Sequence, residues 1–199
     1  EVIDPSTEKA VAVISIGDQA DTDAAVAAAK AAFPAWAATP PAERLAYVEK
    51  ILEVYNRRAQ DMARAISLEM GAPQDMSLED QVDCGVYHIE NFITAFKDFK
   101  FVRPLSADTP DTMIAWEPVG VVASITPWNW PMNQVTLKVI PAILAGDTVI
   151  LKPSEIAPLS SIVWTEIVDE AGLPAGVYNM VNGDGMGVGT QLSTHPDVD

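Results

Sequence analysis

The sequence predicts an α/β fold in which helices pack on a Rossmann-like parallel sheet with the order βαβαβ. Short apolar runs rich in β-branched residues at 119–125, 148–151 and 177–181 are typical of strands buried on both faces. Apolar positions with a helical period separate them, at 132–145 and 160–171, and a glycine follows each helical segment. Strands and helices that alternate in this way form parallel sheets with right-handed crossovers. Polar residues after the strands would then meet at one edge of the sheet, where open α/β sheets bind ligands.

The amino-acid composition favours a folded globular protein and argues against a membrane-spanning or nucleic-acid-binding one. The 199 residues are 49% hydrophobic, which suits a packed core in one domain or in part of a larger one. No apolar run approaches the roughly 18 residues that span a bilayer, and no segment has the charged-then-apolar pattern of a signal peptide, so we expect a cytoplasmic protein. The net charge of −16 argues against nucleic acid and anionic membranes as partners.

The first predicted elements are a turn, a strand and a helix. Residues 3–7 favour a turn, and the apolar run 10–16 predicts a strand. A helix is expected to open at 21–23, where Thr22 is a suitable N-cap and the flanking aspartates suit the positive helix end. Pro34 is expected to end this helix, because the residue before a proline disfavours the helical conformation.

Three more helical segments are predicted before residue 100. The first starts at 39–41 and carries an apolar stripe from Leu45 to Tyr55, and the second ends at Gly71. The third is a long helix that is expected to start at a capping box, 77–80. It contains Cys84, the only cysteine, which has no basic neighbour in sequence to lower its pKa. We therefore expect Cys84 to be a buried or half-buried structural thiol and not a nucleophile.

Three blocks of sequence carry a family resemblance. They are EPVGVV at 117–122, TPWNWP at 126–131 and LKPSE at 151–155, which lie at the first predicted strand, at the loop after it and at the end of the second strand. In this order and spacing they resemble the aldehyde dehydrogenase superfamily, the NAD(P)-dependent enzymes with a catalytic cysteine. The similarity extends from residues 3–8 to the HPDVD end, and it covers only the N-terminal portion of the family.

The resemblance implies three regions. Residues 1–99 would be the N-terminal strand and helical part of the cofactor domain, 100–116 a projecting β-hairpin, and 117–199 the first half of the Rossmann-like NAD-binding domain. The cofactor domain would be incomplete at its C-terminus and the catalytic domain absent, so we expect these 199 residues alone to be inactive. In the family the hairpin helps to assemble the homodimer or homotetramer. A surface hairpin without a special role fits this stretch of sequence equally well.

The implied reaction is the NAD-dependent oxidation of a small-molecule aldehyde to a carboxylic acid, through a thiohemiacetal and a thioester on the cysteine. No metal is expected. Two alternatives stay open. One is a relative that passes the acyl group to coenzyme A. The other is a stand-alone nucleotide-binding or interaction module without catalysis.

Asn129 is the candidate catalytic residue. Its amide is a neutral hydrogen-bond donor in a loop fixed by two prolines, and by resemblance it stabilises the oxyanion that forms when a thiolate attacks an aldehyde. The alternative is an asparagine that only stabilises its own turn. The resemblance places Trp130 in the substrate pocket, whereas packing of a large ring over the sheet edge is the simpler interpretation.

The cofactor site is expected at the two loops and at a glycine series. Lys152 and Glu155 are assigned to the hydroxyls of the adenosine ribose, and the carboxylate favours NAD over NADP because it would repel a 2′-phosphate. The alternative is a lysine that caps a strand end beside a solvated glutamate. The series 183–189 does not fit G-x-G-x-x-G. The remaining residues assigned to the cofactor are Ile125, Thr126, Pro127, Trp128, Ser154, Gly185 and Gly189.

Lys138 lies on the helix that follows the TPWNWP loop. The corresponding family position is near the active site, and a surface lysine with a solvated head group is an equally good interpretation.

Overall fold

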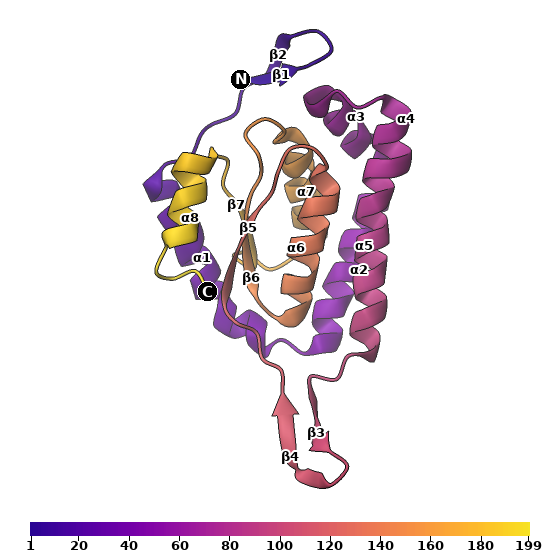
Figure 1. The fold of residues 1–199 in the computed structure, drawn as a ribbon, viewed down its shortest axis with the longest axis vertical. Coiled ribbons are helices and arrows are strands. Elements are labelled where there is room, and N and C mark those ends of the chain that lie inside the picture. Colours follow the sequence, from indigo (N-terminus) through magenta and orange to yellow (C-terminus); the bar gives the residue numbers. More distant parts are fainter.

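The computed structural model describes residues 1–199 and places helices on both faces of a small parallel sheet (Figure 1). The strand order is β5-β6-β7, with β5 at Val121–Ile125, β6 at Thr148–Lys152 and β7 at Tyr178–Met180. Ile125 pairs with Lys152 across the first two strands, and Leu151 pairs with Met180 across the next two. The predicted α/β class and the parallel sheet are confirmed.

The sheet is buried because side chains leave it on both faces. Val149 and Leu151 of β6 join the larger core, with the connecting helices α6 (Pro131–Ala145) and α7 (Leu159–Glu170). Ile150 points the other way, into a smaller core with α1 (Gln19–Ala38), the π-helical segment η2 (Gly185–Gly189) and α8 (Thr190–Thr194). This alternation is the two-residue period of a strand.

A further layer of helices packs on α6 and α7. It consists of α2 (Pro41–Arg57), α3 (Ala59–Met70) and α5 (Asp83–Asp98), and α5 is preceded by α4 (Gln74–Met76) and the π-helical segment η1 (Ser77–Val82). The predicted hairpin is present as β3 (Val102–Ser106) and β4 (Thr109–Ala115), and it projects from the body of the molecule (Figure 1). None of the helices is both long and apolar enough to cross a membrane.

Two expectations for the N-terminal region were wrong. The strand predicted at 10–16 is present as β2, but it covers only Lys9–Ala12. Its partner β1 is only Val2–Asp4, so the chain after Ala12 has no strand to pair with, and Val13 is 81% exposed. The first helix is capped by Asp18, whose carboxylate accepts the N–H groups of Ala20 and Asp21, and not by Thr22. Thr22 is buried inside the helix, where its hydroxyl donates to the Gln191 side chain at 2.7 Å.

Two predicted helix boundaries were also wrong. Pro34 lies inside α1, which continues to Ala38 because its last turn is held by tertiary packing: the indole N–H of buried Trp36 donates to the Ile143 carbonyl at 3.2 Å. The capping box expected at 77–80 does not form, since Ser77 has helical backbone angles and its hydroxyl bonds the Ala72 carbonyl at 3.4 Å. The helical run instead begins three residues earlier, at Gln74.

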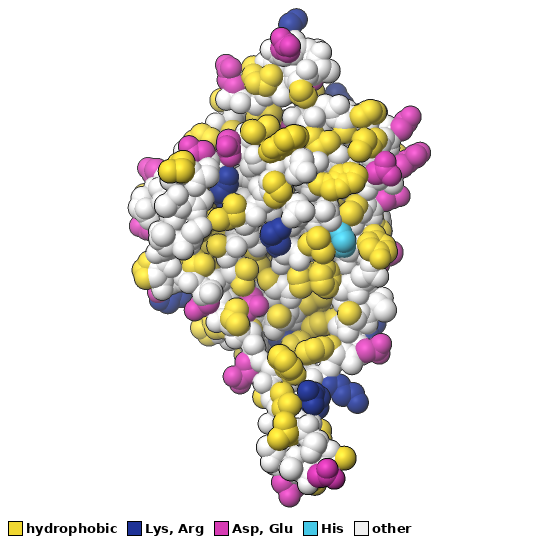
Figure 2. Space-filling model, viewed as in Figure 1, with side chains coloured by type: hydrophobic (Ala, Val, Ile, Leu, Met, Phe, Trp, Pro, Cys, Tyr) yellow, Lys and Arg dark blue, Asp and Glu magenta, His cyan; other side chains and the backbone are white.

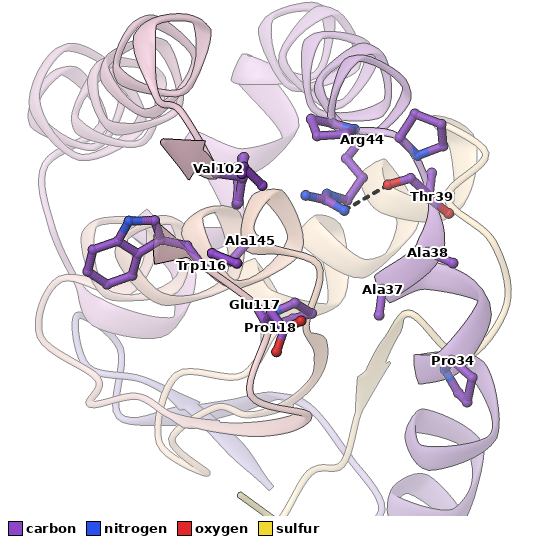
Figure 3. Close-up of a pocket in the computed structure, with 14 residues that line it drawn as sticks. Pro34, Ala37, Ala38, Thr39, Arg44, Val102, Trp116, Glu117, Pro118 and Ala145 are labelled. Carbon is purple, nitrogen blue, oxygen red and sulfur yellow. Dashed lines mark hydrogen bonds between the residues drawn. The ribbon is translucent and has the colours of Figure 1, made fainter. Parts of the chain in front are cut away.

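Arg44 joins the ends of two helices and was not singled out in the sequence. Its Nε–H donates to the Leu144 carbonyl at 2.9 Å, in the last turn of α6, and its Nη1–H donates to the Thr39 carbonyl at 2.7 Å, just after α1 (Figure 3). Only 4% of Arg44 is exposed, and this burial lowers the pKa of its guanidinium while the nearby charge of Asp147 raises it. The carbonyl ends of both helices attract a cation, so this placement is favourable.

The cavity beside Arg44 lies at the wrong edge of the sheet for a ligand. It measures about 600 Å³ and is lined by the end of α1, by the base of the hairpin and by Ala145 at the end of α6 (Figure 3). Glu117 and Pro118 in its wall lead into β5, so the cavity faces the amino ends of the strands. Open α/β sheets bind ligands at the opposite, carboxyl edge.

Gly85 provides a first test of the packing. A Cβ atom at position 85 would lie 2.4 Å from the Tyr55 hydroxyl oxygen, which donates to the Val82 carbonyl. Alanine normally stabilises a helix by about 1 kcal/mol relative to glycine, but Gly85→Ala is expected to destabilise this protein by about 1–3 kcal/mol. Urea unfolding measures the change. In Tyr55→Phe the same alanine should cost less, because the clashing oxygen is gone, and equal costs in both backgrounds would contradict the packing argument.

Candidate functional site

The loops that follow the three parallel strands begin side by side at the carboxyl edge of the sheet. The N–H of Thr126, the first residue after β5, donates to the Lys152 carbonyl at the end of β6 at 3.1 Å. The N–H of Val181, the first residue after β7, donates to the Leu151 carbonyl at 3.0 Å. The TPWNWP loop, the KPSE loop and the glycine series therefore start from one edge, as the sequence predicts.

The TPWNWP loop presents an unbonded amide. Thr126 is buried at its start, whereas Pro127, Trp128 and Asn129 are exposed. Trp130 is half-buried, and its carbonyl accepts the Gln134 N–H at 3.2 Å as α6 begins. Within the chain the Asn129 side chain makes no hydrogen bond, to its own turn or elsewhere. Its amide therefore has donors available for a ligand.

The second loop starts with a buried lysine. The Lys152 side chain is 3% exposed, and its ammonium group pairs with one carboxylate oxygen of Glu155 at 3.3 Å, with Glu155 41% exposed. One partner leaves two of the three ammonium N–H donors for another acceptor. A Cβ atom at position 189 would lie 3.9 Å from Lys152 Cδ, so η2 comes close to this pair. The KPSE loop and η2 therefore bring an ammonium donor and a carboxylate acceptor to the carboxyl edge of the sheet.

The other residues predicted to bind the cofactor differ in their surroundings. Ser154 is buried, and its hydroxyl accepts the Ile156 N–H at 3.2 Å, so it shapes the loop. Ile125, the last residue of β5, is 38% exposed at the sheet edge. Gly185 has open space where a side chain would lie, and Asp184, which sequence reasoning missed, caps η2 through the Gly187 N–H.

Lys138 and Cys84 lie on α6 and α5. The Lys138 ammonium donates to the Gln134 side chain at 2.8 Å, and partial burial lowers its pKa. Cys84 is half-buried, and burial raises the pKa of its thiol, which lies 3.4 Å from His88 Nε2 and 3.5 Å from Asn133 Oδ1. The expectation of a structural thiol agrees with this position, since a raised pKa disfavours the nucleophilic thiolate.

Glu69 is a buried charged residue next to the end of the KPSE loop, and the sequence analysis did not single it out. It lies on α3, and its carboxylate accepts the N–H groups of Leu159 and Ser160, at the start of α7. Burial raises the pKa of Glu69 to about 7, although both N–H donors act to lower it, and no charged side chain adds to the shift. The signal in the sequence was a carboxylate in the last turn of a helix, where the helix dipole disfavours it.

This carboxyl group should make stability depend on pH. Its folded pKa of about 7 lies above the ordinary value of 4.5, so its favourable contribution is complete below pH 4.5 and is lost as the pH rises to 7. At about 1.4 kcal/mol per pH unit, the free energy of unfolding should fall by up to about 3 kcal/mol over this interval. Urea unfolding between pH 4.5 and 8 measures it. The Glu69→Gln variant should not show this fall in stability, whereas the control variant Glu79→Gln, at an exposed position, should show it. A fall that persists in Glu69→Gln would mean that other titratable groups cause it.

Comparison with known proteins agrees with the geometry. The model of the aldehyde dehydrogenase family matches residues 1–199. A 3-succinoylsemialdehyde-pyridine dehydrogenase of a Pseudomonas species is 44% identical over the whole chain, and a putative aldehyde dehydrogenase of Staphylococcus aureus is 40% identical. This chain spans 41% of the length of each of these curated relatives.

Solved structures match equally well in fold. A crystal structure of an aldehyde dehydrogenase from Bartonella henselae has a TM-score of 0.98 at 59% identity, and the match covers 99% of this chain and 41% of that one. A mutant of aldehyde dehydrogenase C from Pseudomonas syringae, solved with NAD⁺ and octanal, has a TM-score of 0.96 at 45% identity, and it covers 100% of this chain and 40% of that one. Over its full length, the chain belongs to the aldehyde dehydrogenase family.

Proposed function

We propose that this chain supplies the oxyanion-binding asparagine and part of the NAD site of an aldehyde dehydrogenase that converts an aldehyde to a carboxylic acid. The observation that carries the proposal is the meeting of two loops at the carboxyl edge of the sheet. One loop holds Asn129 with an unbonded amide, and the other holds the ion pair of buried Lys152 with partly exposed Glu155. The three regions expected from the sequence, 1–99, 100–116 and 117–199, remain part of this proposal.

The Asn129 amide would stabilise negative charge on the aldehyde oxygen. When a thiolate adds to the carbonyl carbon, the oxygen becomes an oxyanion, and a preorganised neutral donor lowers its free energy. The only thiol in this chain is Cys84, whose raised pKa does not suit it for this attack. Because the relatives are more than twice as long as the match, we assign the nucleophile to sequence outside these residues. Trp130, at the start of α6, would border the aldehyde.

NAD fits the second loop and supplies the hydride acceptor when bound. The Lys152 ammonium would donate to a ribose hydroxyl, and the Glu155 carboxylate would accept from one. Trp128 and the backbone from Ile125 to Pro127 would border the cofactor, with Gly185 and Gly189 next to its adenine end. Gly185 leaves room there, since nothing lies within 4 Å of a side chain at 185, whereas Gly189 is buried and a Cβ atom at 189 would lie 3.4 Å from the Asp184 carbonyl oxygen.

Cofactor preference provides the test of the second loop. Glu155 would repel the 2′-phosphate of NADP, so Glu155→Gln is expected to raise the ratio of kcat/KM for NADP to that for NAD about tenfold. The assay is aldehyde oxidation by protein expressed from its complete reading frame. Glu166→Gln, at an exposed position of α7, is the matched control. An unchanged ratio in Glu155→Gln would show that the carboxylate does not face the ribose.

The activity itself is tested by NADH formation with a panel of aldehydes, among them octanal and 3-succinoylsemialdehyde-pyridine, the compounds named for two relatives. Product analysis with and without coenzyme A distinguishes the acid from the acyl-coenzyme A. Absence of NADH with every aldehyde, together with tight NAD binding, would favour the non-catalytic nucleotide-binding module. The 199 residues alone are expected to form no NADH, because they contain no suitable thiol.

The hairpin is a candidate contact between copies of the protein. Its strands expose Val102 at 59%, Leu105 at 50% and Met113 at 52%, and hydrophobic side chains continue from it over the face of the molecule (Figure 2). Exposed apolar patches of this kind mark protein interaction sites. We propose a homodimer or homotetramer that uses this hairpin, and light scattering of the protein from its complete reading frame tests it.

A further inference from the structure

The first turn of α7 is capped from another helix. Pro158 precedes the helix and offers no side-chain cap, so the N–H groups of Leu159 and Ser160 need other acceptors. The Glu69 carboxylate, 90 residues away in sequence, accepts both, the second at 3.1 Å. Glu69 is 2% exposed, so water does not reach these N–H groups to replace the carboxylate, and loss of the two bonds would cost free energy of folding.

The same turn of α7 ends the loop that carries Ser154 and Glu155. This loop, 153–158, starts at the end of β6 and is closed internally by two bonds at 3.2 Å, from the Ile156 N–H to the Ser154 hydroxyl and from the Ala157 N–H to the Ser154 carbonyl. One end of the loop is therefore held by the sheet, and the other end by Glu69. Glu155 lies four residues before Leu159, between these two anchors.

We propose that Glu69 is a positioning residue of the cofactor site: it holds the 153–158 loop so that Glu155 meets the ribose of NAD beside Lys152, which the sheet fixes. This inference rests on the proposed function. Glu69 acts through the loop, because its carboxylate bonds the start of α7 and not Glu155. Without the Glu69 carboxylate the first turn of α7 would fray. NAD binding would then have to order the 153–158 loop, which lowers the affinity.

The experiment compares Glu69→Gln, Glu155→Ala and the double variant in protein expressed from its complete reading frame. Glutamine keeps one acceptor oxygen, so this variant should fold, and exposed Glu79→Gln is the control. We expect Glu69→Gln to raise the Kd and the KM for NAD about fivefold, with kcat at saturating NAD within twofold of the unchanged protein. Amide hydrogen exchange should become faster in residues 153–160. In the double variant the Kd should equal that of Glu155→Ala, because both changes remove the same contact.

The outcomes separate two kinds of failure. If Glu155→Ala weakens NAD binding but Glu69→Gln leaves the Kd unchanged and lowers only the melting temperature, Glu69 is structural and the inference is wrong. Multiplying effects in the double variant would also overturn it, since Glu69 would then act elsewhere. If Glu155→Ala itself leaves NAD binding unchanged, the proposed function of the loop is wrong and the inference falls with it.

Discussion

Replacement of Asn129 by alanine is expected to lower kcat for aldehyde oxidation by a factor of about 10²–10³. Loss of one preorganised oxyanion donor has this size of effect, because the donor acts on charge that exists only in the transition state. The side chain is exposed and makes no hydrogen bond within the chain, so folding should not suffer. Steady-state kinetics of the protein from its complete reading frame, together with its melting temperature, measure both quantities.

Two variants make this result specific. Asn91→Ala removes another exposed asparagine, on α5, and should leave kcat unchanged. Asn129→Asp replaces the donor with a carboxylate that repels the oxyanion, and it should be at least as slow as Asn129→Ala. If Asn129→Ala keeps more than a third of the kcat of the unchanged protein, Asn129 is not the oxyanion donor.

Replacement of Arg44 by methionine is expected to lower the free energy of unfolding by about 3 kcal/mol. The Leu144 and Thr39 carbonyls each lose a donor at the ends of α6 and α1, and an unsatisfied buried group costs about 1–3 kcal/mol. Asp147, 6% exposed, also loses the nearby positive charge. Its carboxylate accepts the Val119 and Gly120 N–H groups at 2.6 and 3.0 Å before β5, so that turn should loosen as well.

Urea unfolding measures the Arg44 effect. Arg44→Lys keeps the charge but reaches fewer acceptors, so it should fall between the methionine variant and the unchanged protein. Exposed Arg103→Met on the hairpin should change the free energy by less than about 0.5 kcal/mol. A loss below 1 kcal/mol in Arg44→Met would show that the two helix ends satisfy their carbonyls without this side chain.

Local patterns predicted the sheet and its carboxyl edge because strand and helix periods act within a few residues. The apolar run at 148–151 is enough to predict strand β6, and the glycine at 146 is enough to predict the end of α6, where Gly146 adopts φ 106°. The family blocks then assigned Asn129, Lys152 and Glu155, and the structure places their loops on neighbouring strands. Those assignments remain predictions until the kinetic tests are done.

The prediction that Pro34 ends the first helix was wrong because of a tertiary contact across many residues. Trp36 holds the helix beyond Pro34 through a carbonyl 107 residues later, and no local rule contains that bond. Arg44 and Glu69 were passed over for the same reason, since the Leu144 carbonyl lies 100 residues after Arg44 and the Leu159 N–H lies 90 residues after Glu69. The two misplaced helix starts have local causes instead. Asp18 and Asp21 form a capping box that begins four residues before Thr22, and the Ser77 hydroxyl bonds the Ala72 carbonyl five residues before it.

The position of α1 decides which part of this chain is able to fold by itself. Val26 and Ala29 of α1 supply one apolar wall of the sheet. The Ile143 carbonyl accepts the Trp36 indole N–H, and the Leu159 N–H donates to the Glu69 carboxylate, so both depend on side chains in the first 99 residues. An expression product that starts at residue 117 would therefore expose one side of its strands and leave α7 uncapped. Because α1, α2 and α3 all bond or pack against residues after 117, we expect the chain to unfold as one cooperative unit, and a fragment without these helices to be insoluble.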